Sequence, residues 1–173
     1  MDAASSTRPP AYSSVIAAFA YQDPISNLVL DLKYHGKLHL ARVLGSQLAD
    51  KLATAVTATP DIILPIPLHR SRLRSRGYNQ AYELAKPVAR KLDVPVDPWR
   101  LQRVRKTPSQ TDLPRRQRAK NVRGAFSVSG DVNGIRIALV DDVMTTGHTS
   151  NAAAEALVGA GARSVEVWLL ARA

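Results

Sequence analysis

Residues 135–154 have the sequence IRIALVDDVMTTGHTSNAAA, and this stretch decides the fold. Its opening segment, Ile135–Val140, is mostly apolar and predicts a buried strand. Asp141–His148 then predicts a loop, and the alanine-rich segment Thr149–Gly161 predicts a helix. A second mostly apolar segment, Ser164–Ala171, predicts another strand. Because the two strands of a strand-helix-strand unit lie parallel, the sequence predicts an α/β protein with a parallel core sheet flanked by helices.

The predicted loop combines two kinds of ligand group. Asp141 and Asp142 stand at the carboxyl end of the strand, where open α/β sheets bind ligands, and we expect both side chains to be exposed. Carboxylates accept hydrogen bonds from vicinal hydroxyls, as on a ribose. Residues 145–150 supply hydroxyls and a flexible backbone at a helix N-terminus, which favours a phosphate. An ordinary turn is the alternative, since Asp, Thr and Gly are common in such connections, but it does not account for this order of residues.

The order of these residues resembles the motif that binds 5-phosphoribosyl-1-pyrophosphate (PRPP) in type I phosphoribosyltransferases. The resemblance implies that Asp141 and Asp142 hold the ribose hydroxyls and are catalytic residues. Together with them, it implies a ribose and 5-phosphate site made of Val143, Met144, Thr145, Thr146, Gly147, His148, Thr149 and Ser150. His148 departs from the motif, which has a smaller residue there.

Longer segments extend the resemblance to most of the chain, from about Phe19 to the end. They are similar to the ComF/GntX family of phosphoribosyltransferase-like proteins, and they read LKYHGKLHLA (32–41), LPIPLHRSRLRSRGYNQAYELA (64–85) and LQRVRKTPSQTDLPRRQRAKNVRGAF (101–126). That family usually carries an N-terminal zinc module built on cysteines. This sequence has no cysteine, so either its lineage lost the module or the module has been trimmed away. We expect a loose tail over residues 1–13 and one phosphoribosyltransferase-like domain over residues 14–173.

The segments before residue 135 predict further elements of an α/β fold. Ser14–Tyr21 predicts a short edge strand, and the leucines spaced by four in Leu38–Val56 predict a helix. Asp61–Leu64 predicts a buried strand between prolines. Asn79–Leu92 predicts a helix, with Pro87 expected to kink or divide it. Val94–Leu101 predicts a further strand, although it contains two prolines.

Alternating arginines follow the strand predicted at Asp61–Leu64. In the phosphoribosyltransferase fold the loop after this strand holds pyrophosphate, and by position that loop is Pro65–Arg70. Arginine suits the task because its planar guanidinium pairs with two phosphate oxygens at once. The resemblance implies pyrophosphate contacts from Pro67, Leu68, His69, Arg70 and Arg76. For any single arginine the alternative is a solvated basic helix face.

A basic segment with little apolar periodicity covers Arg103–Gly124. A long loop in a compact domain is usually functional or disordered. Its R-x-T-x-x-Q pattern, Arg105, Thr107 and Gln110, resembles the catalytic loop of amidophosphoribosyltransferases. The resemblance implies a mobile loop that closes over the site, with Arg105 as a catalytic residue. We expect this segment and Arg70–Arg76 to form one basic surface at the mouth of the PRPP site. If the protein binds DNA, the phosphates should be held there by Arg72, Arg74, Arg115, Arg116 and Arg118.

The amino-acid composition limits which ligands, metals and membranes the protein can be expected to bind. The 173 residues carry 24 basic and 14 acidic side chains, a net charge of +10, which favours a polyanionic partner or simply a soluble basic surface. Without cysteines there is no metal site built on thiolates, and His35 and His39 lack a nearby acidic ligand. No apolar run is long enough for membrane insertion and no signal peptide is evident, so we expect a cytoplasmic protein.

Two classes of function remain open. The first is an enzyme that transfers phosphoribosyl from PRPP, with Mg²⁺ on the pyrophosphate, to an unidentified nitrogenous acceptor. The second, implied by the ComF resemblance, is a protein of natural competence and DNA uptake that handles single-stranded DNA beside a helicase partner, with weak or no catalysis. The aromatic content of 5% argues against base stacking, and Tyr78 and Tyr82 are the expected stacking platforms.

Overall fold

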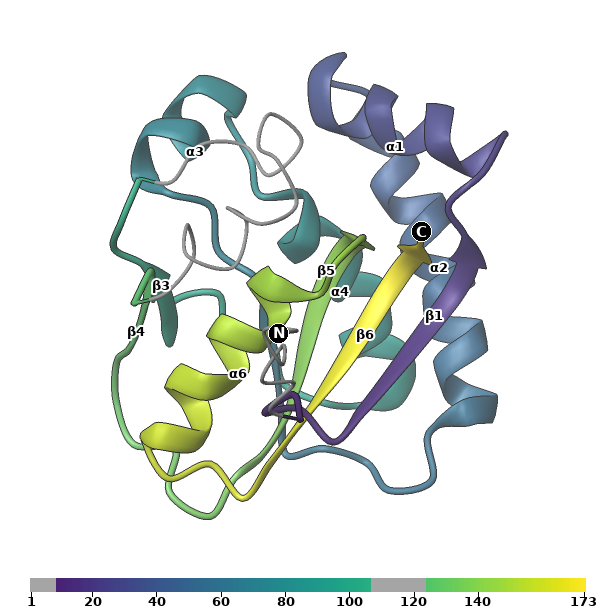
Figure 1. Cartoon of the computed structure of the whole chain (residues 1–173). Helices are drawn as coiled ribbons and strands as arrows, with labels where there is room; N and C mark the ends of the chain where they lie inside the picture. Colours follow the sequence, from purple (N-terminus) through teal and green to yellow (C-terminus); the bar gives the residue numbers. More distant parts are fainter. Residues whose placement is uncertain (1–8, 107–123) are drawn as a thin grey trace, which may run out of the picture.

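A computed structural model describes residues 9–106 and 124–173. Its centre is a four-stranded sheet of order β1-β6-β5-β2, in which every neighbouring pair is parallel. The strands are β1 (Ser14–Ala20), β2 (Ile62–Pro65), β5 (Arg136–Met144) and β6 (Ser164–Arg172). Figure 1 shows β1, β6 and β5 side by side, and β2 pairs with the other edge of β5. The parallel core sheet predicted from the sequence is therefore confirmed.

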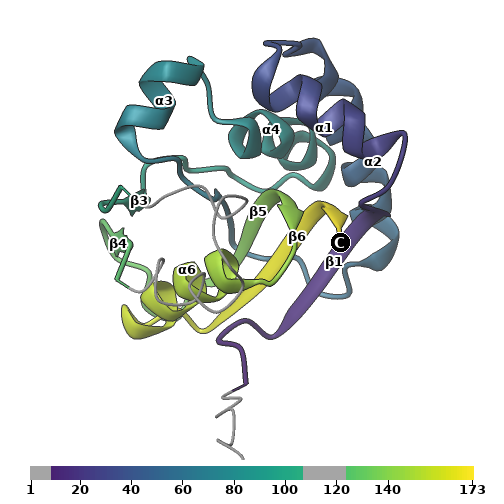
Figure 2. The ribbon, with the colours of Figure 1, turned by 45° about the horizontal axis from the view of Figure 1, so that its top comes forward.

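Helices cover both faces of this sheet. The helix α6 (His148–Gly159) lies on one face, and α2 (His39–Ala55) and α4 (Gln80–Leu92) lie on the other (Figure 2). The side chains of β5 alternate between the two layers. Ala138 and Val140 pack with α2 and α4, whereas Ile137 and Leu139 pack with α6, and all four are buried. Burial on both faces explains why this strand is apolar at successive positions.

The strand β5 is longer than predicted. It continues past Val140 through both aspartates to Met144, because β6 runs beside it and pairs as far as Arg172. The connection to α6 is accordingly reduced to residues 145–147. The two acids therefore belong to a paired strand, and their backbone is held by the sheet.

The helix α4 is more regular than predicted, because Pro87 was expected to kink or divide it. Pro87 lies inside α4, yet the helix is continuous. A Cβ on Gly45 of α2 would lie 2.9 Å from both the Leu84 carbonyl oxygen and the Pro87 ring. The glycine thus lets α2 approach the turn that contains the proline, and close packing of the two helices offsets the hydrogen bond that proline cannot make.

The strand predicted at Val94–Leu101 is wrong. Val96 forms a single bridge to Ile63, the chain then leaves the sheet, and Leu101 at the end of the segment pairs with Val128. Two prolines remove the amide donors that a full ladder requires. Instead β3 (Leu101–Arg103) pairs antiparallel with β4 (Phe126–Val128) in a separate two-stranded sheet. Most of the predicted mobile loop, residues 107–123, lies outside the described residues.

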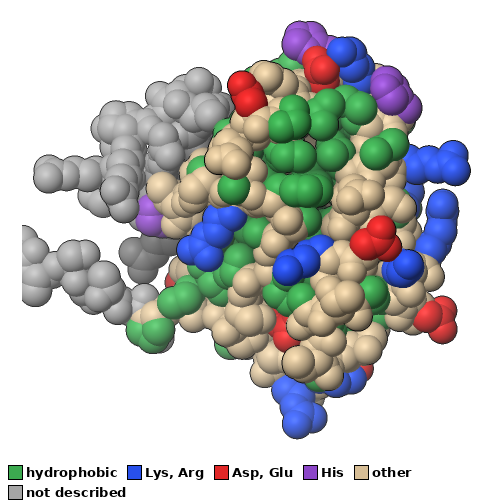
Figure 3. Space-filling model, turned by 90° about the vertical axis from the view of Figure 1, so that its right-hand side faces the viewer, with side chains coloured by type: hydrophobic (Ala, Val, Ile, Leu, Met, Phe, Trp, Pro, Cys, Tyr) green, Lys and Arg blue, Asp and Glu red, His purple; other side chains and the backbone are tan. Residues whose placement is uncertain are grey.

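The strand β1 forms one edge of the sheet, as predicted. Part of the predicted N-terminal tail is fixed there: the Ala11 amide donates to Asn151 Oδ1 at 2.8 Å, and the Ser13 amide donates to the Val165 carbonyl oxygen at 2.8 Å. Figure 3 shows this side, with apolar side chains gathered in its upper part among scattered basic and acidic ones. Among the described helices, none has the length and apolar character needed to span a bilayer.

Candidate functional site

A cavity of about 290 Å³ opens at the carboxyl ends of β2 and β5. The chain leaves these adjacent strands toward opposite faces of the sheet. From β2 it continues to α3 (Arg70–Arg76), and from β5 it turns to α6. Such a divergence creates a crevice at the strand ends, where open α/β sheets bind ligands. The helix α1 (Ile25–Tyr34) supplies a further wall through its last turn.

One rim of the cavity, called here the acid–phosphate rim, consists of Asp141, Asp142 and residues 145–150. The backbone orients both acids: the Asp142 amide donates to Asp141 Oδ1 at 2.8 Å, and the Val143 amide donates to Asp142 Oδ1 at 2.7 Å. The expectation that both acids are exposed is wrong, because Asp142 is only 3% exposed. Successive side chains of a strand point to opposite faces, so Asp142 turns toward the α1 layer.

Lys33 of α1 meets Asp142 there. The Lys33 ammonium lies 3.0 Å from Asp142 Oδ2 as an ion pair, but off hydrogen-bond geometry, so Oδ2 has no hydrogen-bond partner among the described residues. Burial alone would lower the pKa of Lys33, but attraction to Asp142 and Asp141 outweighs it and raises that pKa. Burial, and next the charge of Asp142, raises the pKa of Asp141 to about 8, against the pull of Lys33.

The second half of this rim is the start of α6. Gly147 is the N-cap residue, with φ of 76°, and no side chain caps the helix. A glycine suits the position because a Cβ would strain the backbone and lie 3.1 Å from the Tyr12 hydroxyl. The buried Thr146 Oγ1 has no hydrogen-bond partner among the described residues. The start of α6 thus presents the positive end of its helix dipole to an anion in the cavity.

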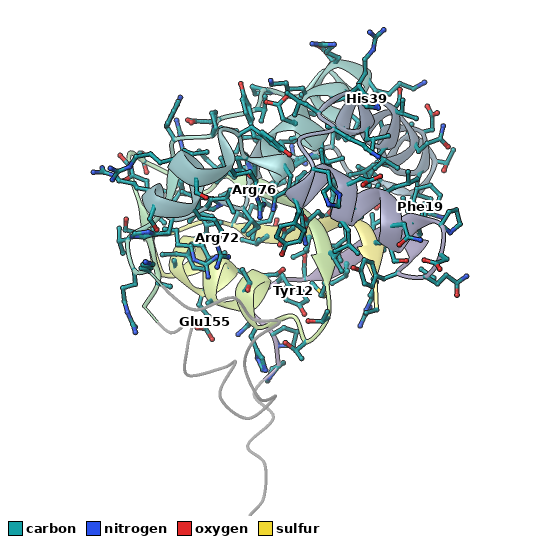
Figure 4. All side chains as sticks on the ribbon, turned by 90° about the horizontal axis from the view of Figure 1, so that it is seen from above. Tyr12, Phe19, His39, Arg72, Arg76 and Glu155 are labelled. Carbon is teal, nitrogen blue, oxygen red and sulfur yellow. The ribbon has the colours of Figure 1, made fainter. Side chains whose placement is uncertain are left out.

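The facing wall, called here the cationic rim, consists of Lys33, Arg72, Arg76 and Arg103. Figure 4 shows Arg72 and Arg76 extending from α3 over the carboxyl end of the sheet. Burial lowers the pKa of Arg103, and repulsion from Arg72 lowers it further, while Asp141 opposes the change. Positive groups that repel one another in a cavity are stabilised by a bound anion. Arg76 is oriented by a bond to Gln80 Oε1 and by the Tyr34 ring, 5.6 Å from its guanidinium carbon.

The structure brings together only part of the predicted site. Pro67 and Leu68 line the cavity with the acids and the loop. His69 does not line it; its Nδ1 accepts from the Ser71 amide at 3.3 Å and so caps α3. Outside the lining lie Thr146, Arg70, Arg74 and Arg105, of which the three arginines are exposed. Arg115, Arg116 and Arg118, expected to hold DNA, lie outside the described residues.

Several cavity residues were not predicted from the sequence. They are Tyr21, Lys33, Tyr34 and Gln80. Lys33 and Tyr34 stand in the quoted segment LKYHGKLHLA and Gln80 stands in the quoted segment 64–85, so the similarity of these segments to a family was a signal for all three. Arg72 and Arg103, both expected on a basic surface at the mouth of the site, line the cavity.

The two expected stacking platforms are engaged elsewhere. The Tyr78 hydroxyl donates to the Leu32 carbonyl oxygen, and the Tyr82 ring lies 4.7 Å from the Lys86 ammonium. The two tryptophans differ sharply, since Trp99 is 74% exposed and Trp168 is fully buried. Trp99 stands between β2 and β3 in the chain, outside the cavity lining. An aromatic surface for stacking is therefore available at Trp99, which was not predicted.

Comparison with protein families and curated proteins gives concordant matches. The model of the phosphoribosyl transferase domain matches residues 78–173. DNA utilization protein YhgH of Salmonella typhi is 35% identical over 169 residues, which are 95% of this chain and 74% of the relative. Competence protein F of Haemophilus influenzae is 35% identical over 171 residues, 95% of this chain and 75% of the relative. Competence protein ComFC of Bacillus subtilis is 26% identical over 157 residues, 90% of this chain and 63% of the relative.

Solved structures with a similar arrangement were also found. A purine phosphoribosyltransferase from Pyrococcus horikoshii aligns with a TM-score of 0.42 and 21% identity, over 76% of this chain and 83% of the other. The protein TT1426 from Thermus thermophilus aligns with a TM-score of 0.46 and 19% identity, over 77% of this chain and 83% of the other.

Proposed function

The chain belongs to the phosphoribosyltransferase family, with Competence protein F and DNA utilization protein YhgH among its relatives, and on that premise we propose that it binds PRPP in the cavity at the end of β5. Its fold is the type I phosphoribosyltransferase fold, as the sequence predicted. One observation carries the proposal. A single cavity joins a pair of acids and a helix N-terminus on one rim to four cations on the other.

The chemistry of PRPP matches this division. Its ribose has two hydroxyls that can donate to Asp141 and Asp142. Its 5-phosphate fits residues 145–150, where the N-terminal end of the α6 dipole favours an anion and where the Thr146 hydroxyl has no hydrogen-bond partner among the described residues. Its pyrophosphate then reaches the cationic rim, where Arg72 and Arg76 can each pair with two oxygens. Pro67 and Leu68 support this end from the loop after β2.

Mg²⁺ enters this proposal as a companion of the pyrophosphate. Among the described residues no group of three or more His, Asp or Glu side chains could hold a metal. Phosphate oxygens and water suit Mg²⁺, so the ion is held by the ligand while the cationic rim receives the complex. When bound, the ion neutralises charge on the leaving pyrophosphate.

The proposed reaction is transfer of the phosphoribosyl group. The bond from C1 of the ribose to a pyrophosphate oxygen breaks, pyrophosphate leaves with the electron pair, and C1 bonds to a nitrogen of the acceptor, which loses a proton. The protein's residues bind and orient PRPP and stabilise the departing charge. Arg105 and the remainder of residues 103–124 are the segment expected to close over the site. We place the reaction in the cytoplasm, in keeping with a chain free of cysteine.

The reaction is tested by incubating the protein with PRPP, Mg²⁺ and a panel of nitrogenous acceptors. Pyrophosphate release would be followed continuously, and products would be identified by mass spectrometry. Acceptor-dependent release that disappears in Asp141→Asn supports a transferase. Binding of PRPP without release in any mixture would leave a PRPP-binding protein and reject the transfer step.

Handling of single-stranded DNA is the second candidate function. It is favoured by the names of the relatives, by the net charge of +10 and by the 74% exposure of Trp99, which can stack on a base. Since Trp168 is fully buried, quenching of tryptophan fluorescence by an oligonucleotide would report on Trp99. The affinity should fall steeply with salt, and replacement of Arg115, Arg116 and Arg118 by Ala should flatten the log–log slope by about 2, at roughly −0.7 per phosphate. Absence of binding at low salt would remove this candidate, and with it the proposed helicase partner.

A further inference from the structure

The ion pair between Lys33 and Asp142 joins two elements that are far apart in the sequence. Lys33 lies in the last turn of α1, and Asp142 lies near the end of β5. Their side chains are 22% and 5% exposed, so both charges are largely removed from water. Burying such a pair contributes little net stability, because desolvation of the two charges offsets their attraction. A role in the site explains the pair better than a role in folding.

The position of α1 does not depend on this pair. Val29 and Leu32 of the same helix are fully buried in the core. The Leu32 carbonyl oxygen accepts from the Tyr78 hydroxyl, which ties the helix to the segment before α4. At the end of the helix, Asp31 is paired with both Lys37 and His35. The helix is therefore anchored by neighbours on each side of Lys33, and the ammonium group is available for another purpose.

The acids need a compensating cation to bind a polyanion. Two adjacent carboxylates repel each other, and they also repel a ligand that carries a phosphate and a pyrophosphate. Lys33 contacts Asp142, and its charge acts on both Asp141 and Asp142. The other titratable or charged side chains that face this corner come from the residue after β1 and from α1, α3, β3 and α6, and they are Tyr21, Tyr34, Arg72, Arg76, Arg103 and His148.

We propose that Lys33 is a positioning residue of the PRPP site: its ammonium group fixes Asp142 and shifts Asp141 toward the carboxylate form that accepts the ribose hydroxyls. This inference rests on the proposed binding of PRPP in the same cavity. The carboxylate form matters because a protonated acid would compete with the ligand hydroxyls as a donor. Binding of PRPP should therefore strengthen as the pH rises through the titration of Asp141.

Removing the Lys33 ammonium group should shift the pH at which PRPP binding is half-maximal. An opposite charge close to an acid lowers its pKa by about 1–3 units, so in Lys33→Met the midpoint of the binding profile should rise by about one pH unit or more. Lys33→Arg keeps the charge and should restore the wild-type midpoint. Lys37→Met serves as the matched control, because Lys37 follows the same helix but pairs with Asp31, away from the cavity. It should leave the profile unchanged.

The experiment is isothermal titration with PRPP and Mg²⁺ between about pH 6 and pH 10.5, on all four proteins, combined with ¹³C NMR titration of the Asp141 carboxyl over the same range in the absence of ligand. A higher midpoint in both measurements for Lys33→Met, with rescue by Lys33→Arg, is the expected result. If the wild type binds no PRPP at any pH, the proposed function fails, yet the NMR titration still tests the effect of Lys33 on Asp141. A folded Lys33→Met with an unchanged NMR midpoint, or a uniform loss of affinity without a pH shift, would overturn the inference.

Discussion

The two rims of the cavity are built in different ways. The acid–phosphate rim comes from one short stretch of chain, Asp141–Ser150, which ends β5 and begins α6. The cationic rim is assembled from α1, α3 and β3, and its members, Lys33 to Arg103, are spread over 71 positions of the chain. Groups of the first rim are fixed by backbone hydrogen bonds and by the start of a helix, whereas the second consists of long side chains. Under the proposed function, we expect the first rim to specify which ligand is bound and the second to supply the charge that attracts it.

Because the acid–phosphate rim is expected to specify the ligand, loss of its two acids should reduce the affinity for PRPP more than any other change. Asp141→Asn with Asp142→Asn should weaken PRPP binding by at least about 100-fold, because each hydrogen bond to a charged group contributes about 1.5–3 kcal/mol. Equilibrium titration measures the loss. Since the double variant also removes the partner of Lys33, Asp141→Asn alone is needed as a control that keeps the ion pair. Unchanged affinity in the double variant would show that the acids do not contact the ligand.

Arg72 and Arg74 belong to the same helix, α3, and provide a matched test of the cationic rim. Arg72 lines the cavity and Arg74 is exposed outside it. Arg72→Ala should weaken PRPP binding by about 10- to 100-fold, the range expected for one charge-assisted contact. Arg74→Ala should have little effect, because an exposed charge is screened by water and salt. Equal losses in the two variants would mean that α3 acts only through its general charge.

The acid–phosphate rim should also reduce the stability of the free protein. The pKa of Asp141 is raised from 3.8 to about 8, so the folded state holds an extra proton between about pH 4 and pH 8 and loses stability as the pH rises through that window. Asp141→Asn should therefore be more stable than the wild type above pH 8, by roughly 1–3 kcal/mol, and about equal to it below pH 4. Denaturant unfolding across this range measures the difference.

Asp61 is a suitable control for the sign of this effect. Its hydrogen bonds to Arg136 lower its pKa to about 2, the direction opposite to that of Asp141. Asp61→Asn should lose stability at neutral pH and match the wild type near pH 2. A stability difference of the same sign in the two variants would contradict the assignment of a destabilised carboxylate to the site.

The smallest expected effect concerns Thr146. Thr146→Val keeps the shape of the side chain and removes its buried hydroxyl, which has no partner in the described part of the protein. The melting temperature of the free protein should stay the same or rise, while affinity for PRPP falls by several-fold, as for about 1 kcal/mol from one neutral hydrogen bond. A large loss of stability in the free protein would show that the hydroxyl has an internal role.

The acid–phosphate rim could be predicted from the sequence, because it is one continuous stretch of chain. The assembly of the cationic rim could not be predicted in this way, because its residues are far apart in the sequence. Asp141 and the loop to Ser150 were predicted because strand, acids and helix start follow one another in the chain. Lys33 could not be paired with Asp142 in this way, because only the packing of α1 over the end of β5 brings them within 3.0 Å. His69 occupied the position of a phosphate ligand, but its ring caps α3. The end of the segment Val94–Leu101 pairs with β4, which is distant in sequence, so its local pattern could not reveal where the strand lies.

The most direct test of PRPP binding is the melting temperature of the protein with Mg²⁺, with and without millimolar PRPP. A ligand at about 100 times its dissociation constant adds about 2.7 kcal/mol, which for a chain of this size raises the midpoint by about 5–10 °C. Ribose 5-phosphate, which lacks the pyrophosphate for the cationic rim, should give a smaller shift. We predict a clear rise with PRPP that Asp141→Asn reduces. A melting temperature that PRPP leaves unchanged in the wild type would contradict the account.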